Sequence, residues 1–366
     1  MSTTTQTCRA FELSERTHDP RWDTFLANSP SGHHVQLSLW GNVKAAAGWE
    51  TRRILVTEDQ QIVGGAQMLI RRARLVGKIG YVPKGPVVAG DDRELQREII
   101  GRLCAMARAN RVRLLLVQPP SDGEALAERL PEWGFRIWPT ELAPSATVQI
   151  DLADDPEELL ARMSKGMRHG IRRSQRNGIS VREGSRDDLP TFHRLLQATG
   201  QRRGFTPFGR DYFERMWDEL HPAGYLRLFI SQVGDEAVSA QIVVAFGDSI
   251  IAKQIGWSGQ HARLRPNEAL DWATIQWGQA HGYRYYDLEG IEPDAAQAVL
   301  RGQGLPEAYV QSPTAYKLRM GGSICLRPPT YCYILNPAWR HVYGLVGERL
   351  LAWPTIRHAV YRFRTN

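Results

Sequence analysis

The sequence predicts an α/β protein built from two similar halves. Its 366 residues suggest two domains, and short Val- and Ile-rich segments alternate with helical segments along the chain. A strand, a polar loop, a helix and a buried strand occur in that order near residues 79–117 and again near 250–288. Because alternating strands and helices are typical of α/β domains, we expect two copies of one α/β unit.

In the first half, short strands precede one amphipathic helix and a buried strand. The first strands are expected at residues 53–56, 62–69 and 79–82, with glycines between them. The helix is expected over 92–109, where apolar residues recur at helical spacing: Leu95, Ile99, Leu103 and Met106. The continuous apolar run at 112–117 is typical of a strand buried in a sheet.

The second half repeats this order. Three consecutive strands are expected at 226–232, 238–246 and 250–255, separated by the turns Gly234-Asp235 and Gly247-Asp248. A helix should then run from about Pro266 to His281, with Gly282 in the position after its end. The next strand is expected at 285–288.

A strongly basic helix is expected between the two halves. Asp155 is placed to cap it, Pro156 suits its first turn, and Glu158 stands where the acid of a capping box belongs. Basic side chains recur along one face, at Lys165, Arg168, His169, Arg172, Arg173 and Arg176. No acid occurs from residue 161 to 180, so these charges repel one another. This pattern favours contact with an anion over an ordinary solvated face.

The composition excludes several classes of protein. With 42% hydrophobic and 23% charged residues, the chain is neither disordered nor fibrous. A net charge of +7 favours a polyanionic partner. The four cysteines are scattered, and the histidines lack zinc-site spacing, so we expect no metal. The N-terminus lacks an apolar signal region, and no apolar run reaches membrane-spanning length, so we expect a reduced, cytoplasmic enzyme.

Five segments, in order from residue 34 to 322, resemble motifs of the FemABX aminoacyltransferases. The N-terminal Q-x-x-x-W-x-x-x-K-x-x-x-G-W pattern runs from Gln36 to Trp49, and the family's Y-x-P-[KR]-G-P turn is similar to residues 81–86. The basic helix and the residues after it, 168–179, resemble R-x-x-I-R-K-A-x-x-x-G-[IV]. Residues 286–291 are similar to the Y-D-[FL]-x-G-I strand end, and residues 316–322 to F-K-x-x-[FM]-G-G.

The resemblance implies two tandem domains of the GCN5-related N-acetyltransferase (GNAT) type, without a coiled-coil arm. We expect an N-terminal domain over 1–153, a second over 154–336 that opens with the basic helix, and a C-terminal helical extension over 337–366. The family transfers an amino acid from an aminoacyl-tRNA to an amine of a peptide, in the best-known members the stem peptide of a peptidoglycan precursor. Because the tRNA ester is already activated, such a transfer requires no metal or organic cofactor.

The resemblance also implies roles for individual residues. Lys317 and Tyr316 match the F-K pair, which implies a cation and a backbone donor beside the tetrahedral intermediate. Substrate contacts are implied for Trp40, Lys44, Lys84, Arg203, Arg210 and Tyr212. Asp287 and Glu289 are expected at the substrate site for a different reason, because they stand at the end of a predicted strand, where α/β sheets place ligands; whether a carboxylate, water or the substrate itself removes the proton stays open. The arginine spacing before Tyr212 departs from the family pattern, so Arg203 and Arg210 remain alternatives and the acceptor itself stays open. Contacts with tRNA or phosphate are expected from Lys165, Arg168, Arg172, Arg173 and Arg176.

Three other functions remain as alternatives. A related enzyme could load an amino acid onto a small peptide natural product, using tRNA without the same phosphate clamp. A coenzyme A-dependent N-acetyltransferase would need a glycine-rich pyrophosphate loop, but residues 256–266 have no G-x-G/A at the helix start, and Pro266 lacks an N–H. A non-catalytic protein that binds tRNA or a membrane surface could use the basic stretch 340–364.

Overall fold

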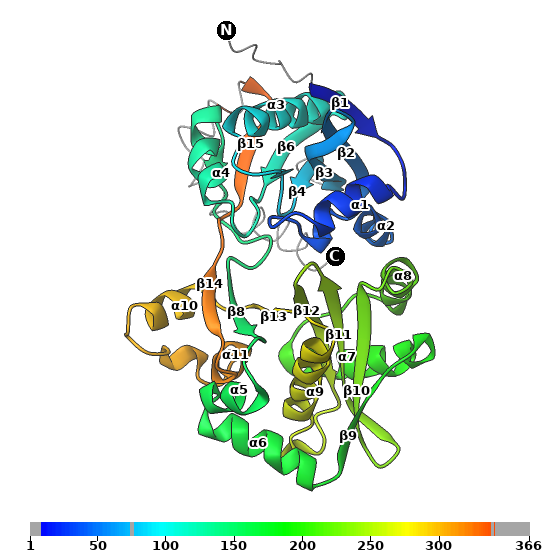
Figure 1. Ribbon diagram of the computed structural model, residues 1–366, viewed down its shortest axis with the longest axis vertical. Helices are drawn as coiled ribbons and strands as arrows, with labels where there is room; N and C mark the ends of the chain where they lie inside the picture. The colour runs from blue at the N-terminus through cyan, green and yellow to red at the C-terminus, as the bar shows by residue number, and fades with distance from the viewer. Residues whose placement is uncertain (1–8, 74–76, 338–339, 341–366) are drawn as a thin grey trace. The chain divides into compact units, whose positions relative to one another are not determined.

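The computed structural model describes residues 9–73, 77–337 and 340 (Figure 1). The chain divides into two compact units. Unit 1 comprises the described residues up to 143 and those from 327 on, and unit 2 comprises residues 144–326. The expected helical extension over 337–366 lies outside the described residues, except for residues 337 and 340.

Unit 1 contains a sheet in the order β1-β2-β3-β4-β6-β15-β7, with β5 paired to β3. Its strands are β1 (Arg9–Ser14), β2 (Glu50–Glu58), β3 (Gln61–Ala73), β4 (Gly77–Val82), β5 (Val87–Val88), β6 (Val112–Val117), β7 (Arg136–Ile137) and β15 (Tyr331–Ile334). Its helices are α1 (Pro20–Ala27), α2 (Ser38–Ala45), α3 (Arg93–Ala109) and α4 (Glu124–Arg129). β4 and β6 form a parallel pair among antiparallel neighbours.

The core of unit 1 lies between α3 and the sheet. Asp92 caps α3 by accepting a hydrogen bond from the backbone N–H of Leu95. The apolar stripe of α3 is buried against β2, β3 and β6, as its spacing predicts. The expected helix over 92–109 and the expected strands of this half are therefore confirmed.

Unit 2 contains a seven-stranded sheet in the order β14-β8-β13-β12-β11-β10-β9. Its strands are β8 (Ala146–Asp151), β9 (Ile179–Glu183), β10 (Leu226–Val233), β11 (Glu236–Phe246), β12 (Ser249–Trp257), β13 (Tyr285–Gly290) and β14 (Ser323–Leu326). Its helices are α5 (Pro156–Arg162), α6 (Lys165–Arg176), α7 (Leu189–Arg203), α8 (Arg210–Leu220), α9 (Pro266–Ala280), α10 (Pro293–Leu300) and α11 (Pro313–Arg319). Figure 1 shows α9 lying across the strands of this sheet, where Trp272 and Ile275 join its core.

The parallel pairing of β12 with β13 is short. It extends only from Ser249↔Tyr285 to Ile251↔Asp287, although β12 continues to Trp257 beside β11. On its other side, β13 has an irregularity between Asp287 and Gly290 where it pairs with β8. The end of β13 is therefore released from β12, and this is where polar side chains gather.

The units divide at residues other than those expected from the sequence. Residues 146–151 fall within the expected first domain (1–153), but they form β8, which pairs with β13 and β14 in the sheet of unit 2. Residues 331–334 fall within the expected second domain (154–336), but they form β15, which pairs with β6 and β7 in unit 1. Each of these strands pairs with strands that are distant in sequence. The local sequence pattern therefore does not indicate which sheet the strand joins.

The expected single helix before residue 177 is two helices. Met163 has extended backbone and ends α5, and the Ser164 hydroxyl caps α6 by accepting from the Met167 N–H at 3.2 Å. The guanidinium of Arg168 donates to the carbonyls of Ala161 and Met163 at 3.0 and 2.5 Å, so it satisfies the open end of α5. Because the apolar spacing of the sequence continues across this break, the sequence pattern predicted one helix.

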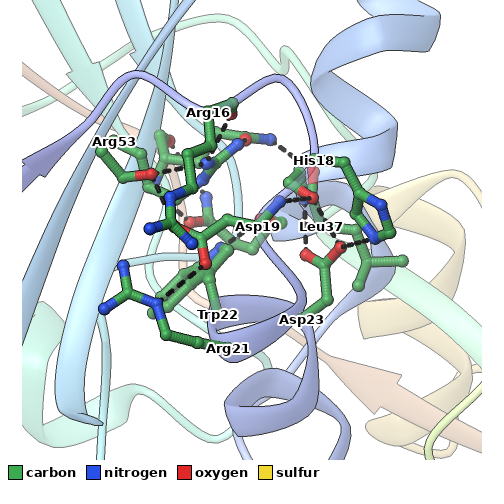
Figure 2. Close-up of polar contacts among 12 residues, drawn as sticks. Arg16, His18, Asp19, Arg21, Trp22, Asp23, Leu37 and Arg53 are labelled. Atoms are coloured by element: carbon green, nitrogen blue, oxygen red, sulfur yellow. Dashed lines mark hydrogen bonds and ion pairs between the residues drawn. The ribbon is translucent and has the colours of Figure 1, made fainter.

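A buried polar cluster in unit 1 fixes the start of α2 (Figure 2). Asp23 accepts hydrogen bonds from the backbone N–H and hydroxyl of Ser38 at 2.7 and 2.5 Å, and the same hydroxyl accepts from the Asp19 N–H at 3.0 Å. Arg53 donates to the carbonyl of Arg16 at 3.2 Å and to the side chain of Gln67 at 2.8 Å. Because these groups are buried and bonded to one another, they hold α1, α2 and β2 in one arrangement.

Candidate active site

The released end of β13 carries a buried carboxylate and a left-handed residue. Asp287 is 3% exposed and accepts hydrogen bonds from the Thr147 hydroxyl at 2.5 Å and from the Glu289 N–H at 2.7 Å. Glu289 has φ = 60°, in a region that non-glycine residues seldom occupy. Such backbone persists only where its surroundings enforce it, and it is concentrated at functional sites.

Glu289 is ion-paired with Lys253, which projects from the part of β12 that is not paired with β13. Both side chains are largely buried. The pair therefore joins the two strands beyond the point where their backbone pairing ends. Sequence reasoning missed Lys253, although a lone lysine in an otherwise apolar strand was a usable signal.

Lys317 on α11 extends its ammonium to the same place. Nζ donates to the carbonyl of Gly290 at 2.7 Å, and within the described chain this is its one hydrogen-bond acceptor. Burial lowers the pKa of Lys317, and three carboxylates oppose that shift by favouring the charged form, those of Glu289, Asp287 and Asp271. An ammonium has three N–H donors, so two remain for a ligand.

Asp271 of α9 lies beneath this group, 2% exposed. Its two oxygens accept hydrogen bonds from the hydroxyls of Tyr286 and Tyr316, both at 2.6 Å. Burial raises the pKa of Asp271, while the two tyrosine hydrogen bonds oppose that rise. Asp271 is not among the residues predicted from the sequence. The pattern that could have indicated it is an acid between Leu270 and Trp272, on the buried side of a helix.

The other expected residues of unit 2 separate into two groups. Tyr212 is buried and stacks on Phe208, with ring centroids 4.0 Å apart. Its pKa is raised by burial and, to a smaller extent, by the charge of Glu289. Arg203 and Arg210 are exposed, and Arg210 pairs with Glu214 on its own helix at 3.0 Å. The structure thus brings Asp287, Glu289 and Lys317 together and leaves the two arginines on the surface.

The expected residues of unit 1 lie on α2 and on the turn after β4. Trp40 is buried, and the Lys44 ammonium lies 5.6 Å from the centroid of its ring. Lys84 is buried in the turn with φ = 49°. Gln36 links the two segments, since its amide nitrogen donates to the Pro83 carbonyl at 2.5 Å just before α2 begins.

The basic face of α6 is exposed at Lys165, Arg172 and Arg176, while Arg168 and Arg173 are half-buried. Arg172 lies 3.9 Å from Glu157, and Arg176 donates to the Arg172 carbonyl at 3.3 Å. Gly170 packs α6 onto α9, because a Cβ there would lie 3.3 Å from the Glu268 side chain. The face therefore has a fixed position on unit 2.

The described ranges, residues 9–73, 77–337 and 340, contain neither a group of metal-binding side chains nor a membrane-spanning helix. No group of three His, Cys, Asp or Glu side chains in them is arranged to hold a metal ion. None of the helices in them is both long and apolar enough to cross a membrane.

Two mixed sheets, each with a central parallel pair, define a protein with two tandem GNAT domains. A family model described as an acetyltransferase (GNAT) domain matches residues 161–297. The fold is similar to a crystal structure of FemX, with a TM-score of 0.77 and 19% identity over 92% of this chain and 99% of that one. A tandem GNAT protein from the clavulanic acid biosynthesis pathway has a TM-score of 0.53 and 12% identity, over 90% and 99% of the two chains.

The FemAB family model matches residues 17–129. A lipid II:glycine glycyltransferase of Staphylococcus aureus strain MRSA252 is 27% identical over 231 residues, which is 60% of this chain and 55% of that protein. The chain belongs to the FemABX family, as its motifs suggest. It spans about half the length of the curated relatives it matches.

The Gly-Gly pair that ends the F-K-x-x-[FM]-G-G motif, Gly321 and Gly322, permits close packing beside α11. Gly321 has φ = 79°, and a Cβ there would lie 2.6 Å from the backbone carbon and oxygen of Arg162. Gly302 has a similar φ of 74°, but a Cβ there would have no neighbour within 4 Å. The two positions therefore share the backbone requirement and differ in the space available.

We expect Gly321→Ala to lower the free energy of unfolding more than Gly302→Ala does. Both variants place alanine in left-handed backbone, at a cost of about 1–2 kcal/mol. Gly321→Ala should lose about 1–3 kcal/mol more, because the backbone of Arg162 has to move. Urea unfolding of both variants measures the difference; equal losses would show that the contact with Arg162 has no energetic weight.

Proposed function

We propose that the protein is an aminoacyltransferase that moves an amino acid from an aminoacyl-tRNA to an amine of a peptide acceptor. The observation that carries this proposal is Lys317, an ammonium with two donors left for a ligand, placed at the released end of β13 in a chain of the FemABX family. The relatives are lipid II:glycine glycyltransferases, so the proposed acceptor is the stem peptide of a peptidoglycan precursor. The reaction would take place in the cytoplasm, where aminoacyl-tRNA is made.

The chemistry requires little beyond positioning and charge stabilisation. The acceptor amine attacks the ester carbonyl, and a tetrahedral intermediate with an oxyanion forms. The C–O bond to the tRNA ribose then breaks, an amide forms, and the proton lost by the amine is balanced by the one gained by the ribose oxygen. A preorganised cation at the oxyanion stabilises the transition state more than the ground state, and Lys317 is the proposed cation.

The remaining residues fit supporting roles in this proposal. Lys44, Trp40 and Lys84 would contact the acceptor in unit 1. Tyr212, Asp287 and Glu289 would bind substrate beside Lys317 in unit 2. The exposed face of α6 would contact tRNA phosphates, with Arg168 contributing less because its guanidinium already caps α5.

A small-peptide acceptor is the second candidate. It is favoured by one observation: both arginines that could clamp an acceptor phosphate are exposed, and Arg210 is already paired with Glu214. The donor would be the same.

The donor is tested directly with the purified protein. We expect transfer of a radiolabelled amino acid from aminoacyl-tRNA to a peptidoglycan precursor and no transfer from acetyl-CoA. Treatment of the charged tRNA with RNase before the reaction should abolish the product. Acetylation that survives RNase and depends on acetyl-CoA would overturn the proposal, and a product formed only with short peptides would favour the second acceptor.

Lys317→Met should reduce kcat by about 10²–10³ with little change in either KM, because the charge acts on the transition state. Methionine keeps most of the aliphatic stem, so packing is preserved. In the wild type, activity should fall as pH rises through the lowered pKa of Lys317, since deprotonation removes the cation. Lys78→Met, at a lysine on β4 paired with Glu50, is the control and should leave kcat unchanged. Retention of turnover by Lys317→Met would exclude this role.

The face of α6 is tested by the salt dependence of tRNA binding. Replacing Arg172 and Arg176 by glutamine should lower the slope of log K against log salt by about 1.5, if each arginine neutralises one phosphate. Arg186→Gln with Arg215→Gln is the matched control, because these exposed arginines are paired with Asp218 and Glu219 elsewhere on unit 2. Equal slopes in both double variants would assign the α6 charges to solvent.

A further inference from the structure

One buried carboxylate joins the two motifs that form the candidate active site. Tyr286 is the second residue of β13, which ends at Gly290, and Tyr316 directly precedes Lys317. Both hydroxyls donate to Asp271 at 2.6 Å, one to each oxygen. β13 and α11 are 22 residues or more apart in sequence (290 to 313), yet they share this single anchor on α9.

The directions of these hydrogen bonds are determined. The Gln241 side-chain amide donates to the Tyr286 oxygen at 2.8 Å. The Tyr286 oxygen is therefore an acceptor from one side, and its own proton is committed to Asp271. Tyr316 donates to the other oxygen, so the carboxylate receives a proton donor on each side.

The position of Asp271 excludes a direct role in the reaction. Its side chain is almost fully buried, and each of its two oxygens already accepts a hydrogen bond from a tyrosine hydroxyl. Lys317 itself is bonded to Gly290 at the end of β13. The Lys317 ammonium is thus fixed by the Gly290 carbonyl of β13, and the preceding residue, Tyr316, is fixed by Asp271.

We propose that Asp271 is a positioning residue that fixes Lys317 against the end of β13 through Tyr316 and Tyr286. This inference rests on the proposed function of Lys317. It also gives the Tyr316 hydroxyl a role: tyrosine stands where the similar F-K motif has phenylalanine, and this hydroxyl has a buried partner. A buried hydroxyl without a partner would be unfavourable, so Tyr316 and Asp271 form a matched pair.

Two substitutions separate the hydrogen bond between Tyr316 and Asp271 from the effect of the negative charge of Asp271. Tyr316→Phe removes the hydrogen bond to α11 and keeps the carboxylate, which Tyr286 still contacts. Asp271→Asn keeps the size and part of the hydrogen bonding but removes a negative charge near Lys317. The other charged groups of this cluster are unchanged in both variants: Asp287 and Glu289, which act on Lys317; Lys253, which pairs with Glu289; and Glu268, which acts on Asp271.

The experiment measures kcat, both KM values and the pH profile of each full-length variant. Tyr316→Phe should lower kcat by about tenfold at unchanged KM, because misplacing a catalytic group reduces the rate without loss of binding. Asp271→Asn should move the high-pH limb of the profile to lower pH, since the lost carboxylate favoured the charged ammonium. Tyr285→Phe, on the same strand and outside the Asp271 network, is the control and should behave as the wild type.

A titration of the Lys317 ammonium by ¹⁵N NMR separates this inference from the proposed function. The lysine pKa should be lower in Asp271→Asn than in the wild type, whether or not the protein transfers amino acids. Absence of transfer from any aminoacyl-tRNA, with that pKa change present, would overturn the function and leave the Asp271 network intact. Wild-type kcat in Tyr316→Phe, or an unchanged lysine pKa in Asp271→Asn, would overturn the positioning role.

Discussion

The short parallel pairing of β12 with β13 is the constraint on which the candidate active site depends. Had the two strands paired along their full length, the backbone groups of residues 288–290 would bond to β12 and face no ligand. Because they separate after Ile251 and Asp287, the carbonyl of Gly290 is available to Lys317, and Glu289 meets Lys253 across the gap. The left-handed backbone of Glu289 and the irregular pairing with β8 follow from the same change of direction.

In both units, a buried polar cluster holds short segments in place beside the sheet. Unit 1 does so with the Asp19, Asp23, Ser38 and Arg53 cluster, which is entirely buried and ties the start of α2 to neighbouring elements. Unit 2 does so with Asp271 and two tyrosines. In each unit, buried acids receive hydrogen bonds from neighbouring segments, and an unpartnered acid in either place would be strongly unfavourable.

Much of the fold could be predicted from local pattern. The helices at 93–109 and 266–280 and the strands between 226 and 290 have clear periodicity and clear ends, such as Asp92 and Gly282. The assignment of β8 and β15 could not be predicted, because it depends on partners distant in sequence. The motifs indicated Lys317, Asp287 and Glu289, whereas Lys253 and Asp271 lie in segments with no motif and acquire meaning only through their contacts. The break between α5 and α6 at Met163 was not predicted, because the apolar spacing of the sequence continues through it.

The junction of α5 with α6 has a consequence for the local stability of unit 2. The N–H of Ser164, at the start of the basic helix, donates to the carbonyl of Arg319, at the end of the helix that carries Lys317, at 2.9 Å. Gly321 packs against the backbone of Arg162 beside this bond. The first turn of α6 and the last turn of α11 therefore belong to one cooperative folding unit. Fraying of either end exposes the other, so the order of the basic helix and that of the helix that carries Lys317 rise and fall together.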